Sequence, residues 1–315
     1  MLVRDDAAVV ERPTAELSQH RAKPCWIDIP DRASPELARI AADLRLHPLA
    51  VEDATQPDER PKIDRYENHY FIVFYAIEAL EPGVVRYHEV SIFVAQNAIV
   101  TVHDGEFSAR QKVEKRFREG RLDTTGLLLH ALLDTMVDQY FDVADQFGDR
   151  IELLEEFIAA DPHETRDVHT PLRELFLAKR DLLKLRHTIS PEREVLQVLV
   201  RGDIHELQEP GRREYFQDVY DHIIRVTDEI DTFRELSSNV IDAYLASASN
   251  RLNEVVKVLT SIATVLLVLT AVTGFFGQNW EFIPYGSVTL FWISMAFMVI
   301  VAVALTVYFR RRGWL

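Results

Sequence analysis

Two long uncharged segments near the C-terminus constrain this chain more than any other feature. Residues 258–280 and residues 282–309 contain no Asp, Glu, Lys or Arg, and Glu281 is the one charged residue between them. About 20 apolar residues are enough for a helix to cross the hydrocarbon core of a bilayer. Two such segments at one end of the chain predict two membrane-spanning helices rather than the buried core helices of a soluble protein.

Basic residues flank these segments on one side only. Lys257 precedes the first segment and Arg310, Arg311 and Arg312 follow the second, whereas the linker at 279–287 has no Lys or Arg. Because basic residues favour the cytoplasmic side of a membrane, both termini are predicted to be cytoplasmic and the linker to be outside. The chain is therefore predicted to be a multi-pass protein of the plasma (inner) membrane.

The rest of the chain is charged and acidic. The sequence has 35 Lys and Arg against 50 Asp and Glu, a formal net charge of −15, which argues against a nucleic-acid partner because phosphate contacts need clustered basic residues. The single cysteine, Cys25, cannot form an intrachain disulfide, as expected for a cytoplasmic domain. No basic-then-apolar leader opens the chain, so no signal peptide is expected. A P-loop, a Gly-x-Ser-x-Gly elbow and a Cys/His cluster are all absent from the sequence, so an enzyme is not predicted.

Residues 1–125 have the pattern of a mixed α/β domain. The apolar runs at 70–76, 90–94 and 98–102 predict strands. Apolar residues recur at helical spacing between residues 34 and 46, with Ser34 as N-cap and Pro35 at the first helical position. The whole chain is thus predicted to be an α+β cytoplasmic domain followed by helices.

Helical patterns dominate from residue 126 onward. Residues 126–211 predict a cytoplasmic helical hairpin region, in which Pro191 breaks or kinks the second helix. Residues 212–278 contain no Pro, and no Gly before Gly274, which predicts a stalk helix on the order of 100 Å long that continues into the first membrane span. The short outer loop at 279–287, the second span at 288–309 and a basic tail at 310–315 complete the predicted organisation.

One face of the stalk helix carries small and hydroxylated residues at alternating steps of four and three. This spacing keeps one face toward partner helices in a left-handed bundle. We call these residues the polar seam: Asp242, Ala246, Ser249, Asn253, Val256, Thr260, Ala263, Leu267, Thr270, Gly274 and Gly277.

The polar seam has two interpretations. Small residues let membrane helices approach closely, so the seam could serve packing alone. A water-filled pore is favoured by the polar groups of Asp242 and Asn253 and by the polar residues Gln278 and Asn279 at the outer end. Two spans cannot enclose such a pore, so it would need several copies of the chain around an axis.

Several short motifs, in order along nearly the whole chain, resemble the CorA family of magnesium and cobalt channels. The family has Gly-Met-Asn at the outer end of its first span, where this chain has Gly277, Gln278 and Asn279 after an aromatic residue. Similar matches are the segments at 47–53, 60–62, 218–222 and 253–264 and the basic, Trp-containing C-terminus at 308–315.

The resemblance implies a funnel-shaped homopentamer that conducts divalent cations through the bilayer. Asn279 would form a ring of oxygens that holds hydrated Mg²⁺ by its waters, with Gly277 and Gln278 completing the selectivity filter. A hydrophobic constriction would gate the pore by dewetting. The residues implied to line the pore are Asp242, Asn253, Val256, Leu259, Thr260, Ala263, Leu267, Thr270 and Gly274.

The resemblance also implies a cytoplasmic Mg²⁺ sensor between subunits. The positions that match the family's sensor are all acidic here: Glu52, Asp53, Asp134 and Asp218. Of these, Asp53 and Asp218 are expected to be metal ligands, as is Asn279 in the filter. Carboxylates opposed across an interface repel each other until a divalent ion bridges them, so loss of the ion would loosen the pentamer and favour opening.

Gln278 stands where the family has Met, and this leaves the identity of the ion open. The first hypothesis is gated influx of Mg²⁺, with Co²⁺ and Ni²⁺ as surrogates. The second is a carrier of Zn²⁺ or another transition metal, linked to protons; the eleven histidines show no His-x-x-x-His spacing, which favours Mg²⁺. The third is a membrane-anchored sensor that conducts nothing.

Overall fold

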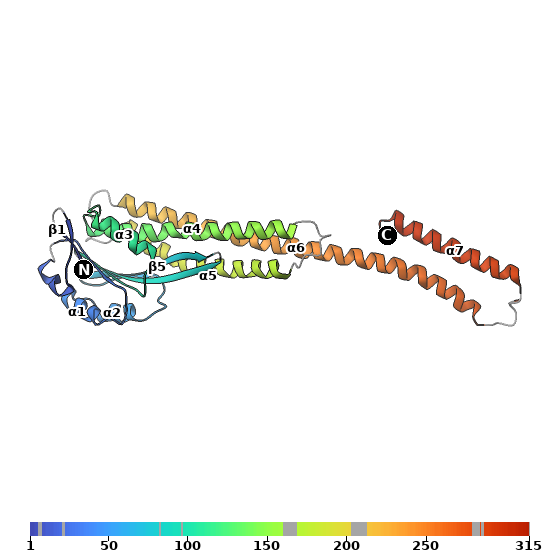
Figure 1. Ribbon diagram of the computed structural model, residues 1–315, viewed down its shortest axis with the longest axis horizontal. Coiled ribbons are helices and arrows are strands. Elements are labelled where there is room, and N and C mark those ends of the chain that lie inside the picture. Colours follow the sequence, from blue (N-terminus) through green and yellow to red (C-terminus); the bar gives the residue numbers. More distant parts are fainter. Residues whose placement is uncertain are drawn as a thin grey trace. The chain divides into compact units, whose positions relative to one another are not determined.

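The computed structural model describes residues 1–5, 8–20, 23–81, 83–95, 97–159, 169–202, 213–278, 284 and 287–314. The chain divides into two compact units, Met1–Val240 and Ile241–Leu315. The long helix α6, Arg213–Phe276, belongs partly to each unit. Figure 1 labels the elements along the chain.

A seven-stranded sheet with the order β2-β1-β3-β7-β6-β5-β4 organises the N-terminal unit. All neighbouring strands are antiparallel except β3 and β7, which are parallel. The strands are β1 (Leu2–Asp5), β2 (Ala8–Glu11), β3 (Cys25–Ile29), β4 (Lys62–Arg65), β5 (His69–Glu81), β6 (Val84–Ala95) and β7 (Ala98–Val102).

The three predicted apolar runs are strands, but two of them are longer than predicted. β5 and β6 continue past the apolar runs into a long hairpin, whose turn includes Gly83 at a φ of 83°. That left-handed conformation costs glycine little, because glycine has no Cβ. The short strands β1, β2, β3 and β4 were not predicted, since four residues, or five with Asp28 among them, give too little pattern to distinguish a strand from a loop.

Two short helices cover one face of the sheet. These are α1 (Pro35–Leu44) and α2 (Pro48–Thr55), which pack together with a 3-10 turn at Thr14–Gln19. The predicted cap of α1 is confirmed, because Ser34 Oγ accepts a hydrogen bond from the backbone N–H of Glu36 at 3.3 Å. Their apolar faces meet the inward side chains of β3, β5 and β7 in one core.

Helices α3 (Ser108–Arg118), α4 (Thr125–Ala159) and α5 (His169–Arg201) lie on the other side of the sheet from α1 and α2, with the β5–β6 hairpin alongside α4 and α5 (Figure 1). Pro191 was predicted to break or kink its helix, and the first alternative is wrong, because α5 continues through Pro191 to Arg201. Proline removes one helical hydrogen bond, and the buried apolar contacts on both sides of Pro191 hold the helix together.

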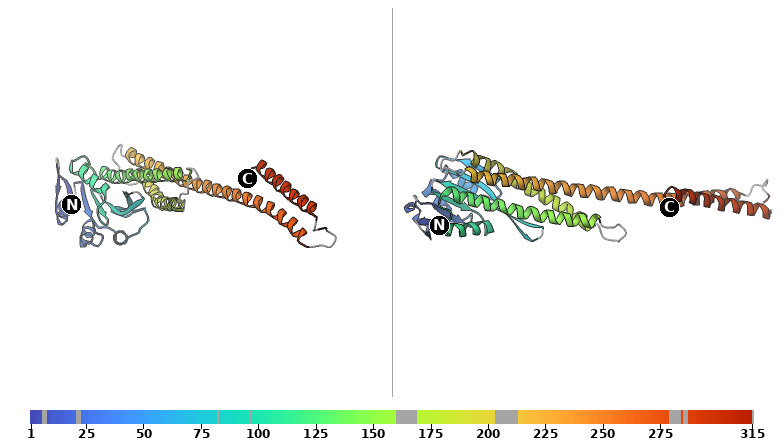
Figure 2. Two further views of the ribbon diagram at one scale, coloured as in Figure 1. Left: turned by 45° about the vertical axis from the view of Figure 1, so that its right-hand side comes forward. Right: turned by 90° about the horizontal axis from the view of Figure 1, so that it is seen from above.

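The first half of α6 packs closely on α4 and α5, as the two views of Figure 2 also show. The Phe233 ring of α6 lies over Gly148 of α4, where an added Cβ would come within 2.5 Å of the ring. An ion pair of 2.7 Å between Arg186 Nε and Asp231 Oδ1 joins α5 to α6. The missing side chain at position 148 therefore leaves room for the Phe233 ring between α4 and α6, and the ion pair fixes α6 separately to α5.

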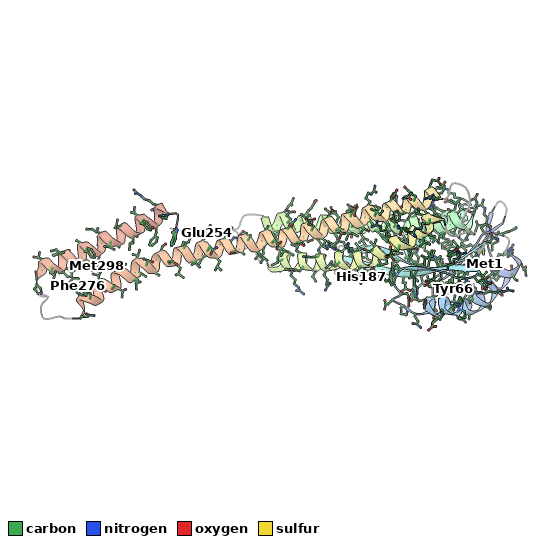
Figure 3. The ribbon with its side chains drawn as sticks, turned by 180° about the vertical axis from the view of Figure 1, so that it is seen from behind. Met1, Tyr66, His187, Glu254, Phe276 and Met298 are labelled. Carbon is green, nitrogen blue, oxygen red and sulfur yellow. The ribbon has the colours of Figure 1, made fainter. Side chains whose placement is uncertain are left out.

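The C-terminal unit consists of the end of α6 and of α7 (Val288–Arg311). Both helices are long and apolar enough to cross a membrane. Most of their large apolar side chains are exposed, including Leu267 at 69% and Val288 at 70%, and Figure 3 shows side chains standing out from both helices near Phe276 and Met298. Such an apolar exterior matches a hydrocarbon environment rather than water. The predicted order of an α+β domain, a long helix and a final apolar helix is confirmed.

Candidate ion pathway and acidic metal site

All residues of the polar seam are exposed on α6 in the single chain, as is Leu259. From Ser261 onward, burial distinguishes the faces of the helix. Ser261 is fully buried, and Val265, Val268, Val272 and Phe276 follow it as half-buried residues at steps of four and three. With about 100° of rotation per residue, these buried and half-buried residues lie on the opposite face of α6 from the polar seam.

The buried stripe of α6 is the face that meets α7. A groove of about 590 Å³ lies between the two helices, and its walls include Val268, Val272 and Phe276 of α6 with Leu290 and Ile293 of α7. α7 therefore covers one side of α6 and leaves the polar seam on the opposite side. That side is available to other molecules, including other copies of this chain.

Thr270 and Gly274 of the polar seam both face open space in the single chain. The Thr270 hydroxyl donates its hydrogen to the Leu266 carbonyl of its own helix at 2.8 Å, so the lone pairs of its oxygen are what it can offer to a neighbour. A Cβ added to Gly274 would meet nothing within 4 Å in the single chain. Glycine within a helix costs about 1 kcal/mol relative to alanine, and no neighbour among the described residues requires Gly274 to lack a side chain.

The outer end of α6 is described only as far as Gln278. The backbone N–H of Gly277 donates to the Thr273 carbonyl at 2.9 Å, and that of Gln278 donates to the Phe275 carbonyl at 3.3 Å. Helical turns thus continue through the first two residues of the Gly277-Gln278-Asn279 motif. Asn279, the predicted filter residue, lies outside the described residues, and its role stays a prediction.

A cluster of metal-binding side chains lies in the N-terminal unit between α4 and α6. Asp134 of α4 and Asp218 and His222 of α6 each offer a ligand atom, and these atoms all lie within 4.8 Å of one another. His222 also approaches a second carboxylate of α4, with 3.8 Å between its Nδ1 and Asp138 Oδ1. Two carboxylates and an imidazole are a donor set that divalent transition metals accept, and the carboxylates suit Mg²⁺ as well.

The electrostatics of this cluster favour a bound cation. Burial raises the pKa of Asp134 and the charge of Asp218 raises it further, although Arg116 and His222 oppose the shift. Burial together with the charge of Asp134 likewise raises the pKa of Asp138. Burial and mutual repulsion therefore make the ionised carboxylates energetically unfavourable, and a bound divalent ion would offset this by its positive charge. Because protons compete for the same oxygens, ion binding is expected to weaken as the pH falls through the raised pKa values.

The predicted sensor residues do not all meet in one chain. The structure brings Asp134 and Asp218 together, but Glu52 and Asp53 lie on α2, on the opposite face of the sheet (Figure 1). Glu52 is exposed. Asp53 forms an ion pair within its own chain, with 2.7 Å between its Oδ2 and Lys62 Nζ. The same Lys62 Nζ lies 3.0 Å from Glu59 Oε2.

Three residues near these acids were missed by reasoning from the sequence: His222, Asp138 and Lys62. Asp218 and His222 are four residues apart, which puts a carboxylate and an imidazole on one helix face, but this spacing is not a pair of histidines. No local signal could have found Asp138 as a neighbour of His222, because the two lie on different helices. Lys62 was part of a recognised motif, but its pairing with Asp53 depends on how β4 lies beside α2.

Removing the Lys62 amine should strengthen any site that uses Asp53. In Lys62→Met, the Asp53 carboxylate loses its cation, so the affinity of the protein for Mg²⁺ should rise about threefold to fivefold, the equivalent of a surface ion pair of up to about 1 kcal/mol. The measurement is Mg²⁺ titration of thermal stability. Arg60→Met, which makes the same change in net charge nearby, is the control. An unchanged affinity in Lys62→Met would remove Asp53 from the set of ligands.

Comparison with known proteins gives a consistent result along the chain. The family model described as CorA-like Mg²⁺ transporter protein matches residues 21–311. The cobalt/magnesium transport protein CorA of Thermotoga maritima is 34% identical over 304 residues, which cover 93% of this chain and 84% of that protein. The zinc transport protein ZntB of Pectobacterium carotovorum is 24% identical over 305 residues, covering 93% and 88%.

The fold has a counterpart among solved structures. The complete structure of the CorA magnesium transporter from Methanocaldococcus jannaschii superposes with a TM-score of 0.78 at 23% identity, covering 92% of this chain and 91% of that one. Similarity at this identity concerns the fold alone. It extends over both the sheet-containing unit and the two apolar helices.

Proposed function

The chain belongs to the CorA family of Mg²⁺ transporters, and from this premise we propose that it is a channel for Mg²⁺ and Co²⁺ whose pore is lined by the polar seam of α6. It is a membrane protein with C-terminal transmembrane helices and not an enzyme. The proposed orientation places both termini in the cytoplasm and the loop around Asn279 outside, in the plasma (inner) membrane. This orientation rests on the basic residues Lys257 and Arg310, Arg311 and Arg312.

The observation that supports a pore most directly is the position of α7. It packs against the face of α6 that carries Val268 and Val272, and it leaves the seam with Thr270 and Gly274 uncovered. A ring of copies, proposed to be a homopentamer, would turn the uncovered seam toward the axis and α7 toward lipid. In that arrangement the small residues leave room for a hydrated ion, and the apolar surface of α7 faces hydrocarbon.

The proposed pathway separates selection from gating. At the outer mouth, Asn279 would offer amide oxygens to the waters of Mg²⁺, which gives up its hydration shell reluctantly. Further in, Thr270 offers lone pairs because its hydrogen is committed to its own helix. The side chains of Val256, Leu259, Ala263 and Leu267 would form an apolar ring that excludes water when it is narrow. Narrowing of this apolar ring would be enough to close the pore to ions.

Ion flux into proteoliposomes tests this function. The purified full-length chain is reconstituted, and uptake of Mg²⁺, Co²⁺ and Zn²⁺ is compared with and without a pH gradient. We expect saturable Mg²⁺ and Co²⁺ uptake that is driven by the ion gradient and does not need the pH gradient. Zn²⁺ uptake that depends on protons, with no Mg²⁺ flux, would contradict the proposal. A monomer or dimer in native mass measurement would contradict the pore and support the non-conducting sensor.

Zinc transport is the second candidate function, and Gln278 is the observation that favours it. By the resemblance to the family, Gln278 stands in the proposed filter where a Met is expected, which puts an amide where a thioether would be. The similarity to a zinc transport protein along 93% of the chain and the imidazole of His222 in the acidic cluster are compatible with it. The same uptake experiment separates the two functions, because each predicts a different ion and a different driving force.

We infer that the acidic cluster senses cytoplasmic Mg²⁺. Asp134, Asp218 and His222 are placed to hold one side of a divalent ion, and Glu52 and Asp53 of a neighbouring copy are proposed to approach it from the other. The sheet separates the two sets within one chain, as expected if they meet only across an interface. Bound Mg²⁺ would then join neighbouring copies and hold the pore closed, and its loss would free them to move.

A fixed cation at the acidic cluster should make the stability of the channel independent of Mg²⁺. In Asp218→Lys the ammonium group would replace the ion, so protection of the channel from protease by Mg²⁺ should largely disappear. A ligand present at about 100 times its Kd stabilises the folded state by about 2.7 kcal/mol. The variant should lose a stabilisation by Mg²⁺ of about this size. The measurement is the rate of limited proteolysis with and without Mg²⁺.

The matched control for this prediction is Asp221→Lys on the same helix. Asp221 is exposed and accepts a hydrogen bond from Gln217 at 2.8 Å, outside the cluster. Asp221→Lys makes the same change of charge as Asp218→Lys. Because Asp221 is not part of the cluster, this variant should keep the protection by Mg²⁺ that the parent shows. If Asp218→Lys is protected by Mg²⁺ as well as the parent is, the proposed bridge between carboxylates is wrong.

A further inference from the structure

A buried carboxyl group that belongs to neither proposed ion site has no part in the function described above. Glu192 of α5 is fully buried, with 0% of its surface exposed. Among the residues that the structure describes, no Lys, Arg or His forms an ion pair with it. A carboxylate without a cation is costly to bury, so the state of this group needs its own explanation.

Glu192 lies at an interrupted edge of the sheet. β4 pairs with β5 only as far as Val73, and the next residue with the same orientation along β5 is Tyr75. Its backbone N–H donates to Glu192 Oε1 at 2.8 Å, and its carbonyl oxygen is contacted by the hydroxyl of Tyr140 of α4. Two side chains thus satisfy the backbone groups that a longer β4 would have paired.

The number of protons in this contact determines the state of Glu192. The Tyr140 oxygen also lies 2.9 Å from Glu192 Oε2. One hydroxyl has one hydrogen, and it cannot be donated both to the Tyr75 carbonyl and to Glu192. If Glu192 were a carboxylate, one of two buried acceptors would lose its donor. If Glu192 carries a proton, all three contacts are hydrogen bonds.

We propose that Glu192 is protonated at neutral pH and donates its proton to Tyr140, which closes a ring of three hydrogen bonds that fastens α5 and α4 to β5 and opens when Glu192 ionises. In this ring Tyr75 donates to Glu192, Glu192 to Tyr140, and Tyr140 to Tyr75. When the Glu192 proton leaves to solvent, Tyr140 must turn its hydrogen to the carboxylate, and the Tyr75 carbonyl is left without its donor.

The surrounding charges leave Glu192 alone with these two partners. Arg193 of α5 donates to Tyr220 of α6 at 3.3 Å. Glu78 of β5 accepts from the backbone of Ser108. Of the other cations on α5, Lys184 lies over the Tyr87 ring, with 4.3 Å between its Nζ and the ring centre, and Arg186 pairs with Asp231 of α6. The acids Glu194, Asp138 and Asp142 are exposed, and Glu89 pairs with Arg32. Among the residues that the structure describes, none of these charged groups forms an ion pair with Glu192.

The pKa shifts agree with this geometry. Burial raises the pKa of Glu192 well above its ordinary value, against the opposing hydrogen bonds from Tyr75 and Tyr140. The sign of the linkage follows. Between the ordinary pKa of about 4.3 and the raised pKa, the unfolded chain has lost the proton and the folded chain keeps it. Stability contributed by Glu192 therefore falls as pH rises through this window, and it changes no further above the raised pKa.

Infrared difference spectroscopy of the full-length protein tests the protonation state. Glu192→Gln is the matched variant, because its amide keeps both an acceptor for Tyr75 and a donor for Tyr140. At pH 7 we expect the parent to show the carbonyl stretch of a buried carboxylic acid that shifts in D₂O, and the variant to lack it. If the parent and the variant have identical spectra in that region, Glu192 is ionised and the proposal is wrong.

The dependence of thermal unfolding on pH gives the second readout. Relative to Glu192→Gln, the unfolding equilibrium constant of the parent should rise by up to about tenfold for each pH unit between pH 5 and the raised pKa. In Tyr140→Phe the acid loses its acceptor, so its carbonyl stretch should move to the position of a less bonded carboxylic acid. Parallel pH profiles in the parent and Glu192→Gln would overturn the proposal.

Discussion

Replacing Gly274 by Leu should stop divalent cation flux almost completely while the protein still inserts and assembles. Within one chain an added Cβ at this position meets nothing within 4 Å, and leucine is a better helix former than glycine, so neither folding nor helix stability should suffer. In a ring of copies, however, a leucine from each chain would enter the proposed pore near its outer end. Because a narrow apolar ring excludes water, we expect Mg²⁺ uptake to fall roughly tenfold or more.

Thr273→Leu is the control for this prediction. Thr273 is exposed on the adjacent position of α6, about 100° around the helix from Gly274, and its hydroxyl donates to carbonyls of its own helix. The same side chain placed there should point away from the proposed pore axis and leave uptake close to that of the parent. If Gly274→Leu conducts normally as an intact oligomer, the seam does not line the pore and serves helix packing instead.

Replacing Asn279 by Ala should have a comparable effect for a different reason. An alanine methyl group cannot accept hydrogen bonds from the waters of a hydrated ion, so the proposed ring of amide oxygens would be lost. We expect selective Mg²⁺ uptake to be abolished or severely reduced, with the oligomer intact by native mass measurement. Unchanged uptake would remove Asn279 from the filter.

Gln278→Met separates the role of Asn279 from that of its neighbour in the proposed filter. This substitution places Met where the resemblance to the family implies one and leaves Asn279 in place. Mg²⁺ uptake should persist, while any difference in the preference for Mg²⁺ over Zn²⁺ reports the contribution of the Gln278 amide. A variant that loses all flux would show that position 278 shapes the mouth of the pore as strongly as Asn279 does.

The acidic cluster and the seam are tested by different measurements. Sensing of Mg²⁺ and conduction can therefore be tested separately. Substitutions at Gly274 and Asn279 are expected to change flux without changing protection by Mg²⁺. Substitutions at Asp218 and Lys62 are expected to change protection by Mg²⁺ while leaving the conducting residues untouched. A channel that conducts but is insensitive to internal Mg²⁺ would therefore retain the first half of the proposal and lose the second.

The sequence alone determined the features that depend on local composition and period. The two spans followed from the absence of charge over residues 258–280 and 282–309, and the start of α1 followed from Ser34 and Pro35. The family followed from motifs that occur in order. The seam was also visible, because residues on one helix face recur at a fixed spacing whatever the helix packs against.

Only the tertiary structure decided which groups meet across elements. It placed α7 on one side of α6 and so left the seam uncovered, and it brought His222 to Asp134, separated Asp53 from both, and paired Asp53 with Lys62. It also carried α5 through Pro191 and brought Glu192 to a gap in the sheet. The physical reason is common to all of these. Periodicity specifies the direction of a side chain within its own element, whereas its partners depend on how separate elements pack.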